Sequence, residues 1–265
     1  MTTHLVGVIH LPPLPGSPRA SVDTRACARQ AGEDAKVLAD CGFDRIILEN
    51  FGDAPFFAGR VPPVTVAAMT ACAIAVREAA PGLALGINVL RNDAESALGI
   101  AVATGAVCIR VNVLTGARVT DQGVIQGDAA SLLRSRRALG AESVEVWADV
   151  DVKHSAPLAA RPVADEVSDL VSRALAGAVL VTGEGTGRAV DHAKLEEVQK
   201  AVRGRVPVLV ASGATIGALG SLARRCDGVI VGSALRGDGV AGGPIDAKRS
   251  QEFARAFRLS FAASR

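Results

Sequence analysis

The chain has 265 residues, of which 49% are hydrophobic and 21% are charged, and its formal net charge is +2. Its Lys and Arg residues are scattered, which argues against a nucleic-acid surface or a polybasic membrane anchor. No apolar run approaches the roughly 20 residues that a membrane-spanning helix needs. We therefore expect a small-molecule partner, no nucleic acid and no membrane span.

Short β-branched runs alternate along the chain with Ala-rich segments of helical spacing. Strands are predicted at residues 5–11, 44–49, 83–90, 107–113, 144–153, 178–182, 206–211 and 228–231. Helices are predicted near residues 22–40, 63–79, 93–104, 128–139, 163–175, 192–203, 215–225 and 246–261. This alternation favours parallel strands joined by right-handed crossovers.

Eight such units in about 250 residues match the size of a (β/α)8 barrel. We predict an α/β fold, a TIM barrel that forms a single domain over residues 1–265. A doubly wound open sheet is the alternative. It is disfavoured because the first strand is followed by HLPPLPGSP, at residues 10–18, rather than by a glycine-rich fingerprint.

Polar residues follow nearly every predicted strand, at the end where such a barrel builds its active site. They are His10, Glu49, Asn50, Asn88, Arg110, Asn112, Asp149, Asp151, Lys153, Thr182, Glu184 and Ser212. We expect His10, Asn88, Arg110, Asn112 and Thr182 to bind substrate. Structural alternatives are that the asparagines satisfy loop backbone, that His10 is a hydrogen-bonded spacer, and that Arg110 and Glu49 form an ion pair.

The segment EVWADVDVKH, at residues 145–154, alternates apolar and polar side chains and predicts Asp149, Asp151 and Lys153 on one strand face. Charges spaced roughly 6–7 Å apart perturb one another's ionisation, which suits acid–base chemistry. With Glu49, these three form the predicted catalytic set: Asp149 or Glu49 as general base, and Lys153 or Arg110 stabilising an oxyanion. An edge strand with a solvated polar face is the structural alternative.

Two chemical variants use the same side chains. In one, Lys153 forms a Schiff base with the substrate. In the other, Asp149, Asp151 and Glu49, with His10 or His154, hold a divalent metal, Mg²⁺ or Zn²⁺. The spacing does not identify a cofactor, so the cofactor stays unknown at this point.

Small residues follow the last two predicted strands, in ASGAT at 211–215 and VGSAL at 231–235. Backbone amides and helix N-termini at this position of a barrel commonly bind phosphate. The predicted phosphate-binding residues are Ser212, Gly213, Thr215, Gly232 and Ser233. The nearby TGEGTGR at 182–188 is interpreted as an anion clamp, with a plain surface loop as the alternative.

Several long motifs resemble the BtpA family, which includes the SgcQ-type proteins. They are GVIHLPPLPGSP at 7–18, ILENFGDAPF at 47–56, VPPVTVAAMT at 61–70, NVLRNDAESALGIAVATGA at 88–106, IRVNVLTGARVTDQGVIQGDA at 109–129, ADVDVKHSAPL at 148–158 and DGVIVGSALRGDG at 227–239. The resemblance implies a ribulose-phosphate-binding type of TIM barrel. The chain departs from the family pattern at TGEGTGRAVD, the segment that contains Glu184 and Arg188. It also carries Arg236, where lysine is common and Arg could still serve as an anion partner.

We expect an enzyme, a lyase, isomerase or hydrolase, acting on a sugar phosphate or nucleoside-related phosphate by acid–base chemistry. A non-catalytic assembly factor for a photosystem-type membrane complex, the role behind the family's name, is the alternative. Five dispersed cysteines without a C-x-x-C pair indicate free thiols and a cytoplasmic location. Phe51, Phe56 and Phe57 crowd one loop beyond Glu49, which predicts a cap over the site or a homo-oligomer interface.

Overall fold

The computed structural model describes residues 3–183 and 190–263. Parallel strands close into a barrel in the order β1-β11-β10-β9-β7-β4-β3-β2. Their bounds are β1 His4–His10, β2 Arg45–Glu49, β3 Ala84–Asn88, β4 Cys108–Val111, β7 Glu145–Val150, β9 Ala178–Val181, β10 Val208–Val210 and β11 Gly228–Val231. Because β1 pairs with both β2 and β11, the sheet has no free edge, and the predicted (β/α)8 barrel is confirmed. The open-sheet and edge-strand alternatives are wrong.

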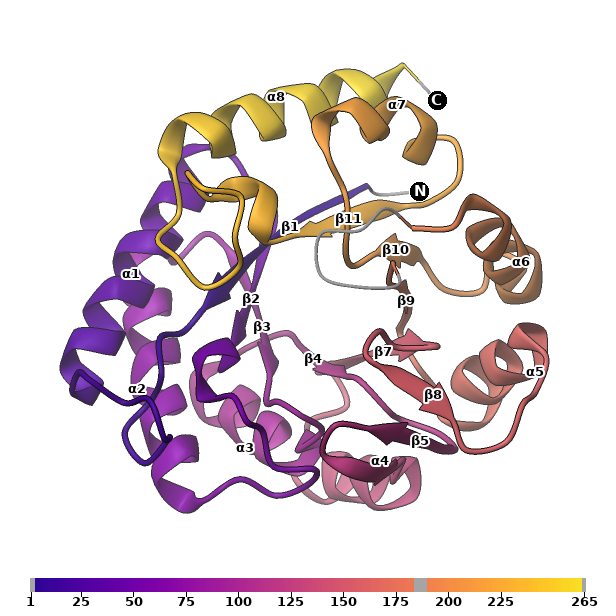
Figure 1. The fold of residues 1–265 in the computed structure, drawn as a ribbon, viewed down its shortest axis with the longest axis horizontal. Helices are drawn as coiled ribbons and strands as arrows, with labels where there is room; N and C mark the ends of the chain where they lie inside the picture. Colours follow the sequence, from indigo (N-terminus) through magenta and orange to yellow (C-terminus); the bar gives the residue numbers. More distant parts are fainter. Residues whose placement is uncertain (1–2, 184–189, 264–265) are drawn as a thin grey trace.

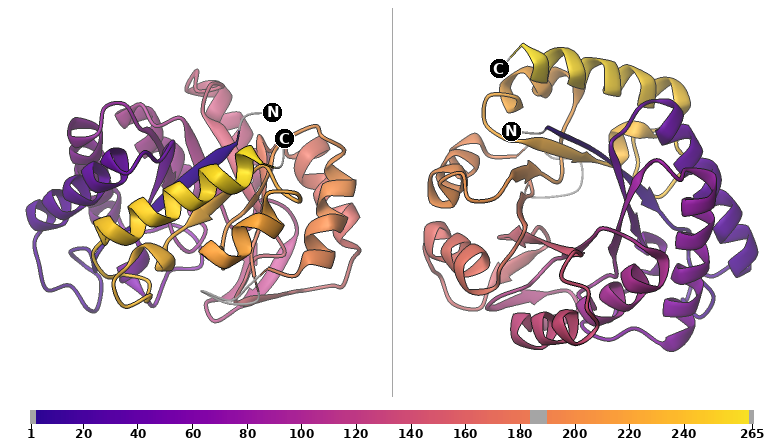
Figure 2. Two further views of the ribbon diagram at one scale, coloured as in Figure 1. Left: turned by 90° about the horizontal axis from the view of Figure 1, so that it is seen from above. Right: turned by 180° about the vertical axis from the view of Figure 1, so that it is seen from behind.

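Helices surround the barrel as an outer ring (Figures 1 and 2). Their bounds are α1 Thr24–Asp40, α2 Pro63–Ala79, α3 Ala94–Thr104, α4 Ala129–Ala138, α5 Val163–Ser168, α6 His192–Val202, α7 Leu219–Leu222 and α8 Ala247–Ala262. Most of the longer helices begin with an Asp side chain that accepts a hydrogen bond from a first-turn N–H group. These caps are Asp23, Asp93, Asp128, Asp191 and Asp246. None of the described helices is long and apolar enough to cross a membrane.

Apolar side chains fill two separate layers. One lies inside the barrel and includes Val6, Ile47, Trp147 and Leu209. The larger layer lies between the strands and the helices, where Phe253, Phe257 and Phe261 of α8 are buried as their four-residue spacing predicted. The middle of the barrel is therefore packed, and buried polar side chains of the strands, such as Glu49 and Arg110, lie nearer their C-terminal ends.

Several predicted elements end earlier than expected, and two of them bear on the site. Strand β7 stops at Val150 because its ladder with β9 stops at the pair Val150–Val181. The helix predicted at 215–225 is only a 3₁₀ turn, η3 Ile216–Ala218, followed by the single turn of α7. Gly217 and Gly220 fall inside this segment, and glycine disfavours a continuous helix.

A small antiparallel sheet at the barrel mouth was not predicted. It consists of β5 Ala117–Thr120, β6 Gly123–Gln126 and β8 Ser155–Pro157, in the order β6-β5-β8. Strands β5 and β6 belong to the connection that follows β4, and β8 follows β7. The sheet therefore ties together the two connections that carry Asn112 and Lys153. Short helical turns also occur at η1 Phe51–Asp53, η2 Asp169–Arg173 and η4 Ser233–Leu235.

Candidate active site

Two adjoining cavities lie at the C-terminal ends of the strands. The inner cavity, of about 50 Å³, lies against the loops that follow β10 and β11. The outer cavity, of about 740 Å³, opens between the loops that follow β1, β2, β3, β4 and β7. Four residues line both cavities: Glu49, Phe51, Arg110 and Lys153. The described residues thus place a carboxylate, a guanidinium and an amine where the two spaces join.

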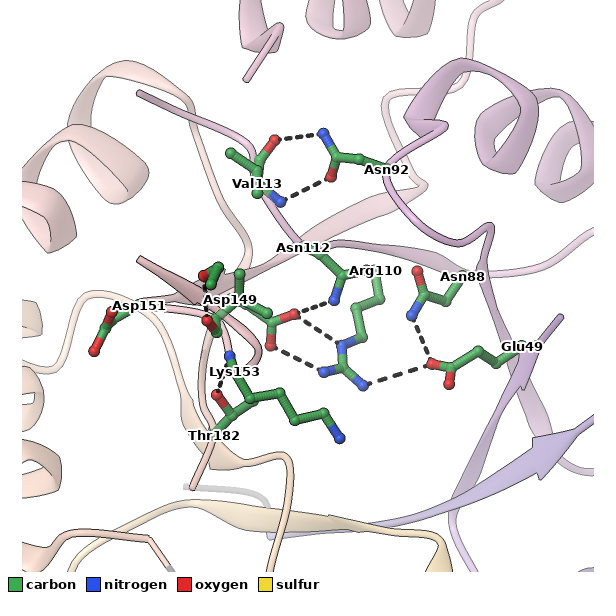
Figure 3. Close-up of polar contacts among 12 residues, drawn as sticks. Glu49, Asn88, Asn92, Arg110, Asn112, Val113, Asp149, Asp151, Lys153 and Thr182 are labelled. Carbon is green, nitrogen blue, oxygen red and sulfur yellow. Dashed lines mark hydrogen bonds and ion pairs between the residues drawn. The ribbon is translucent and has the colours of Figure 1, made fainter. Parts of the chain in front are cut away.

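A buried chain of charges crosses the barrel from β2 to β7 (Figure 3). Arg110 on β4 donates to Asp149 through Nε (3.2 Å) and Nη2 (3.1 Å). Its Nη1 lies 3.8 Å from Oε2 of Glu49, which also accepts a 2.7 Å hydrogen bond from Asn88. Asn112 donates to the Asp149 carboxylate as well, while its own carbonyl oxygen is buried without a partner.

The two carboxylates of this chain occupy different environments. The Asp149 side chain has no exposed surface and lines neither cavity. The Glu49 side chain keeps 9% of its surface exposed and lines both. A general base needs access to the proton that it removes, so Glu49 fits that role and Asp149 is better placed to hold Arg110.

The charges also shift the ionisation of their neighbours. Burial alone would lower the pKa of Arg110, but Asp149 and Glu49 outweigh it and raise the pKa above its ordinary value. The pKa of Lys153 is lowered, first by burial and then by Arg110, although Glu49 and Asp149 oppose the shift. A lysine in this state releases its proton more readily than a surface lysine does.

Backbone contacts fix the loop that carries Lys153. Its amide N donates to Thr182 Oγ1 at 3.1 Å, and its carbonyl accepts from Arg91 Nη2 at 2.8 Å. Two neighbours, Asp151 (φ +46°) and His154 (φ +58°), adopt left-handed backbone conformations that non-glycine residues rarely take. Thr182, predicted to bind substrate, therefore contacts the Lys153 backbone and lines neither cavity.

Asp151 is not part of this cluster, and the prediction that it shares a strand face with Asp149 and Lys153 is wrong. The strand ends at Val150, and the left-handed turn directs the Asp151 carboxylate away from Arg110 (Figure 3). It pairs instead with Arg118 and Lys194. Burial would raise the pKa of this carboxyl, but the two cations outweigh that effect and lower it.

His10 is a neutral neighbour of Glu49. Burial, followed by Arg236, Lys153 and Arg110, lowers the pKa of His10 well below its ordinary value. Its Nδ1 accepts a 3.2 Å hydrogen bond from the Gly242 amide, which leaves the proton on Nε2, 3.9 Å from Glu49 Oε1. His10, Glu49 and Asn88 are register partners on successive strands, so β1, β2 and β3 align them in one row.

The predicted phosphate-binding residues divide between two places. Ser212, Gly213, Gly232 and Ser233 line the inner cavity. Thr215 lies outside it, in a depression between η3 and α8, so the sequence placed this residue wrongly. Only short turns follow β10 and β11, and the predicted contribution of a helix N-terminus is therefore weak there. The backbone amides of the two loops are then the groups that could bind an anion in the inner cavity.

Arg236 is a structural residue rather than an anion partner, contrary to expectation. Its fully buried guanidinium donates to the backbone carbonyls of Gly243, Gly232 and Val8. These bonds join the loops that follow β11 to β1. The expected clamp residues Glu184 and Arg188 lie outside the described residues.

The aromatic loop after β2 covers the cavities in part. Phe51 lines both and stacks on His10 with ring centroids 4.4 Å apart, and Phe56 lines the outer cavity. Phe57 is 57% exposed. Of the three phenylalanines predicted to form a cap, Phe51 and Phe56 therefore line the cavities and Phe57 does not.

Sequence reasoning missed several residues of the outer cavity: Arg19, Arg91, Asp121 and Gln122. The signal for Arg91 was available, since it is the first charged residue after the β3 strand. Asp121 and Gln122 belong to the turn between β5 and β6, a hairpin that was not predicted.

The described residues offer no metal site: no group of three His, Cys, Asp or Glu side chains could hold an ion. The carboxylates of Asp149 and Asp151, which the metal variant required together, point to different partners. The metal-dependent mechanism therefore has no set of ligands among the described residues.

A family model described as the BtpA family matches residues 1–258. The chain belongs to the BtpA family. Its sequence is 44% identical over 254 residues to the photosystem I biogenesis protein BtpA of Synechocystis, covering 95% of this chain and 87% of that protein. It is 42% identical to the uncharacterized protein PF0860 of Pyrococcus furiosus, covering 95% and 93% of the two chains.

Solved structures resemble this BtpA-family member in fold alone, because their sequence identity is low. One is N-(5′-phosphoribosyl)anthranilate isomerase of Pyrococcus furiosus, at a TM-score of 0.59 and 16% identity, covering 97% of this chain and 99% of that chain. Another is (S)-3-O-geranylgeranylglyceryl phosphate synthase of Thermoplasma acidophilum, in complex with sn-glycerol-1-phosphate. Its TM-score is 0.58 at 15% identity, covering 98% of this chain and 93% of that chain.

Proposed function

We propose that this protein is an enzyme that acts on a phosphorylated small molecule, a sugar phosphate or a nucleoside-related phosphate, by acid–base chemistry at the barrel mouth. The observation that carries the proposal is the junction of the two cavities, where Glu49, Arg110 and Lys153 meet. A purely structural barrel gains nothing from these groups, because burying charges costs free energy. The reaction class that fits is a lyase, isomerase or hydrolase.

Each group has a distinct role in the proposed chemistry. The phosphate occupies the inner cavity, where Gly213 and Gly232 let backbone amides approach the anion. Glu49, held by Asn88 and facing the cavities, removes a proton from the substrate. Lys153 and Arg110 stabilise the negative charge that develops. Asp149 keeps Arg110 in position.

The lowered pKa of Lys153 also favours the Schiff-base variant, in which its neutral amine attacks a substrate carbonyl. Borohydride treatment separates the two mechanisms. Reduction in the presence of the turned-over substrate adds a covalent mass to Lys153 only if the Schiff base forms.

Similarity in fold supports the phosphate part of the proposal. The two similar barrels are an isomerase named for a phosphoribosyl compound and a synthase in complex with a glycerol phosphate. The name of the Synechocystis relative instead favours the assembly role. That alternative predicts ligand binding without turnover.

The test is incubation of the purified protein with phosphorylated pentoses, hexoses and nucleosides, followed by mass spectrometry. We expect turnover of at least one compound, and loss of that turnover in Glu49→Gln and in Lys153→Met. Gly232→Val should weaken binding, because a Cβ at this position would come within 2.9 Å of the His10 ring inside the cavity. Gly217→Val is the matched control, since Gly217 is exposed and has open space around it.

Two results would contradict the proposal. Binding without turnover by the wild type, unchanged in Glu49→Gln and Lys153→Met, would support the assembly role. Equal affinities of Gly232→Val and Gly217→Val for the same phosphorylated ligand would remove the inner cavity as the phosphate site.

A further inference from the structure

Arg91 is a buried arginine that the proposed chemistry does not use. It follows β3, is 7% exposed and lines the outer cavity. Its backbone N donates to the Phe57 carbonyl at 3.1 Å, and its Nη2 donates to the Lys153 carbonyl at 2.8 Å. One hydrogen bond therefore fixes the backbone of Arg91, and the other fixes its guanidinium.

The other buried arginines have their charge or donors satisfied within the protein. Arg110 pairs with Asp149, Arg118 pairs with Asp151 and Glu166, and Arg236 donates to backbone carbonyls. A guanidinium has five N–H donors. Across residues 3–183 and 190–263, Arg91 makes one side-chain hydrogen bond and no ion pair, which sets it apart from the other three.

The donors that remain on Arg91 face the outer cavity rather than packed protein. Its Nε and Nη1 make no hydrogen bond with a described residue, and neither atom is sealed from solvent. Those atoms thus stay accessible from the cavity that Arg91 lines. Burial lowers the pKa of Arg91, with Asp149 opposing and Arg110 adding to the shift.

The surroundings of Arg91 favour an anion over a neutral group. Arg19 and Lys153 line the same cavity, and its carboxylates are Glu49, which contacts Arg110, and the exposed Asp121. Pro12 and Phe56 supply apolar walls, which strengthen an ionic contact by excluding water. A planar guanidinium with free donors matches a carboxylate or a phosphate through paired hydrogen bonds.

We propose that Arg91 is the centre of a second oxyanion subsite, so that the substrate carries a carboxylate or second phosphate at the end remote from its first phosphate. This inference rests on the proposed function, because it takes the inner cavity as the site of the first phosphate. The two anions then flank Glu49 and Lys153, which line both cavities. Arg91 also holds the Lys153 carbonyl, so an anion bound there is joined through one side chain to the loop of the reactive amine.

Matched ligand pairs test the inference by titration calorimetry. 6-Phosphogluconate carries a carboxylate that glucose 6-phosphate lacks, and ribulose 1,5-bisphosphate carries a phosphate that ribulose 5-phosphate lacks. We expect the doubly anionic member of at least one pair to bind the wild type about 10- to 100-fold more tightly, as a charge-assisted pair does. The pair that shows the preference identifies the second anion as carboxylate or phosphate.

Variants assign the preference to its residue. Arg91→Met should weaken the doubly anionic member much more than the singly anionic member and so abolish the preference. Arg91→Lys, which keeps the charge and is less disruptive to folding, should retain part of it. Gly232→Val should weaken both members of a pair alike. Equal affinities within both pairs for the wild type, or an Arg91→Met effect that is the same for both members, would overturn the inference.

A readout that needs no knowledge of the substrate comes from selenate-soaked crystals. We expect anomalous peaks both beside Arg91 and between the β10 and β11 loops, with only the first lost in Arg91→Met. A peak at the loops alone contradicts the second subsite and leaves the proposed function standing. A peak beside Arg91 alone contradicts the phosphate site. A peak beside Arg91 without any preference in the ligand pairs means an adventitious ion only and overturns the inference.

Discussion

The Arg110–Asp149 pair should dominate the stability of the barrel mouth, and Asp149→Asn is the sharpest perturbation of it. The substitution preserves shape but removes the charge that faces Arg110 at 3.1 and 3.2 Å. Its new NH₂ group must also face a donor of Arg110 or Asn112. Breaking a buried ion pair from one side costs about 3–5 kcal/mol. Because Asn keeps one acceptor oxygen, we expect a loss of about 3 kcal/mol in the free energy of unfolding.

For a chain of this length each kcal/mol shifts Tm by about 2 °C, so Asp149→Asn should lower Tm by about 6 °C. Asp151→Asn is the matched control two residues away. Its side chain is 39% exposed, and its buried partner Arg118 also lies 3.8 Å from Glu166, so we expect a smaller loss than for Asp149→Asn. Urea denaturation and calorimetry at neutral pH compare the two variants. A Tm decrease for Asp149→Asn no larger than that for Asp151→Asn would refute this reasoning.

The same pair can be tested by removing both charges. Arg110→Met combined with Asp149→Leu leaves neither member of this pair as a buried ion without its partner, so the double variant should lose less stability than the sum of the two single variants. Additive losses would mean that Arg110 and Asp149 are not coupled.

Three further predictions follow from other contacts. His10 has a lowered folded-state pKa, so the unfolded chain binds the proton first; stability should fall as pH drops from about 6.5 through the folded pKa, and His10→Gln should flatten that slope in pH-dependent denaturation. Gly52→Ala should lower Tm much more than Gly59→Ala, because a Cβ at Gly52 would lie 2.3 Å from the Pro13 nitrogen, whereas Gly59 has open space. The exposed Phe57 supports the predicted homo-oligomer; we expect light scattering to detect an oligomer that Phe57→Ser weakens, and a concentration-independent monomer would contradict it.

The sequence predicted the barrel well because the barrel follows from a local pattern. Each β-branched run is short and is followed by a helix, and the Asp caps mark most helix starts. The positions of Glu49, Arg110 and Lys153 at the mouth then follow from the topology alone. These three residues needed no long-range information.

The errors arose where neighbouring strands set the outcome. Residues 150–153 continue the alternation of β7, so nothing local shows that the strand stops at Val150. The stop comes from β9, whose last ladder partner is Val181. Asp151 then turns outward to cations that are distant in sequence, Arg118 and Lys194. The alternation of apolar and polar residues within one strand cannot show where its neighbouring strand ends.

Arg236 and Arg91 show the same limit for single residues. Both are arginines that follow barrel strands, and Arg236 was expected to be an anion partner because it stands where lysine is common in the family. Arg236 is fully buried because its guanidinium donates hydrogen bonds to the backbone carbonyls of Gly243, Gly232 and Val8. Which arginine has donors left for a ligand depends on these carbonyls, and their positions come from the tertiary fold.

Arg110 connects stability with chemistry at the mouth. Asp149 holds it from a sealed position, and Glu49 contacts it from the open side at 3.8 Å. The longer contact leaves the Glu49 carboxylate facing the two cavities, where a substrate can reach it. The same guanidinium raises the cost of protonating Lys153, whose pKa it helps to lower. One buried cation thus contacts the carboxylate that faces the cavities and helps to lower the pKa of the neighbouring Lys153 amine.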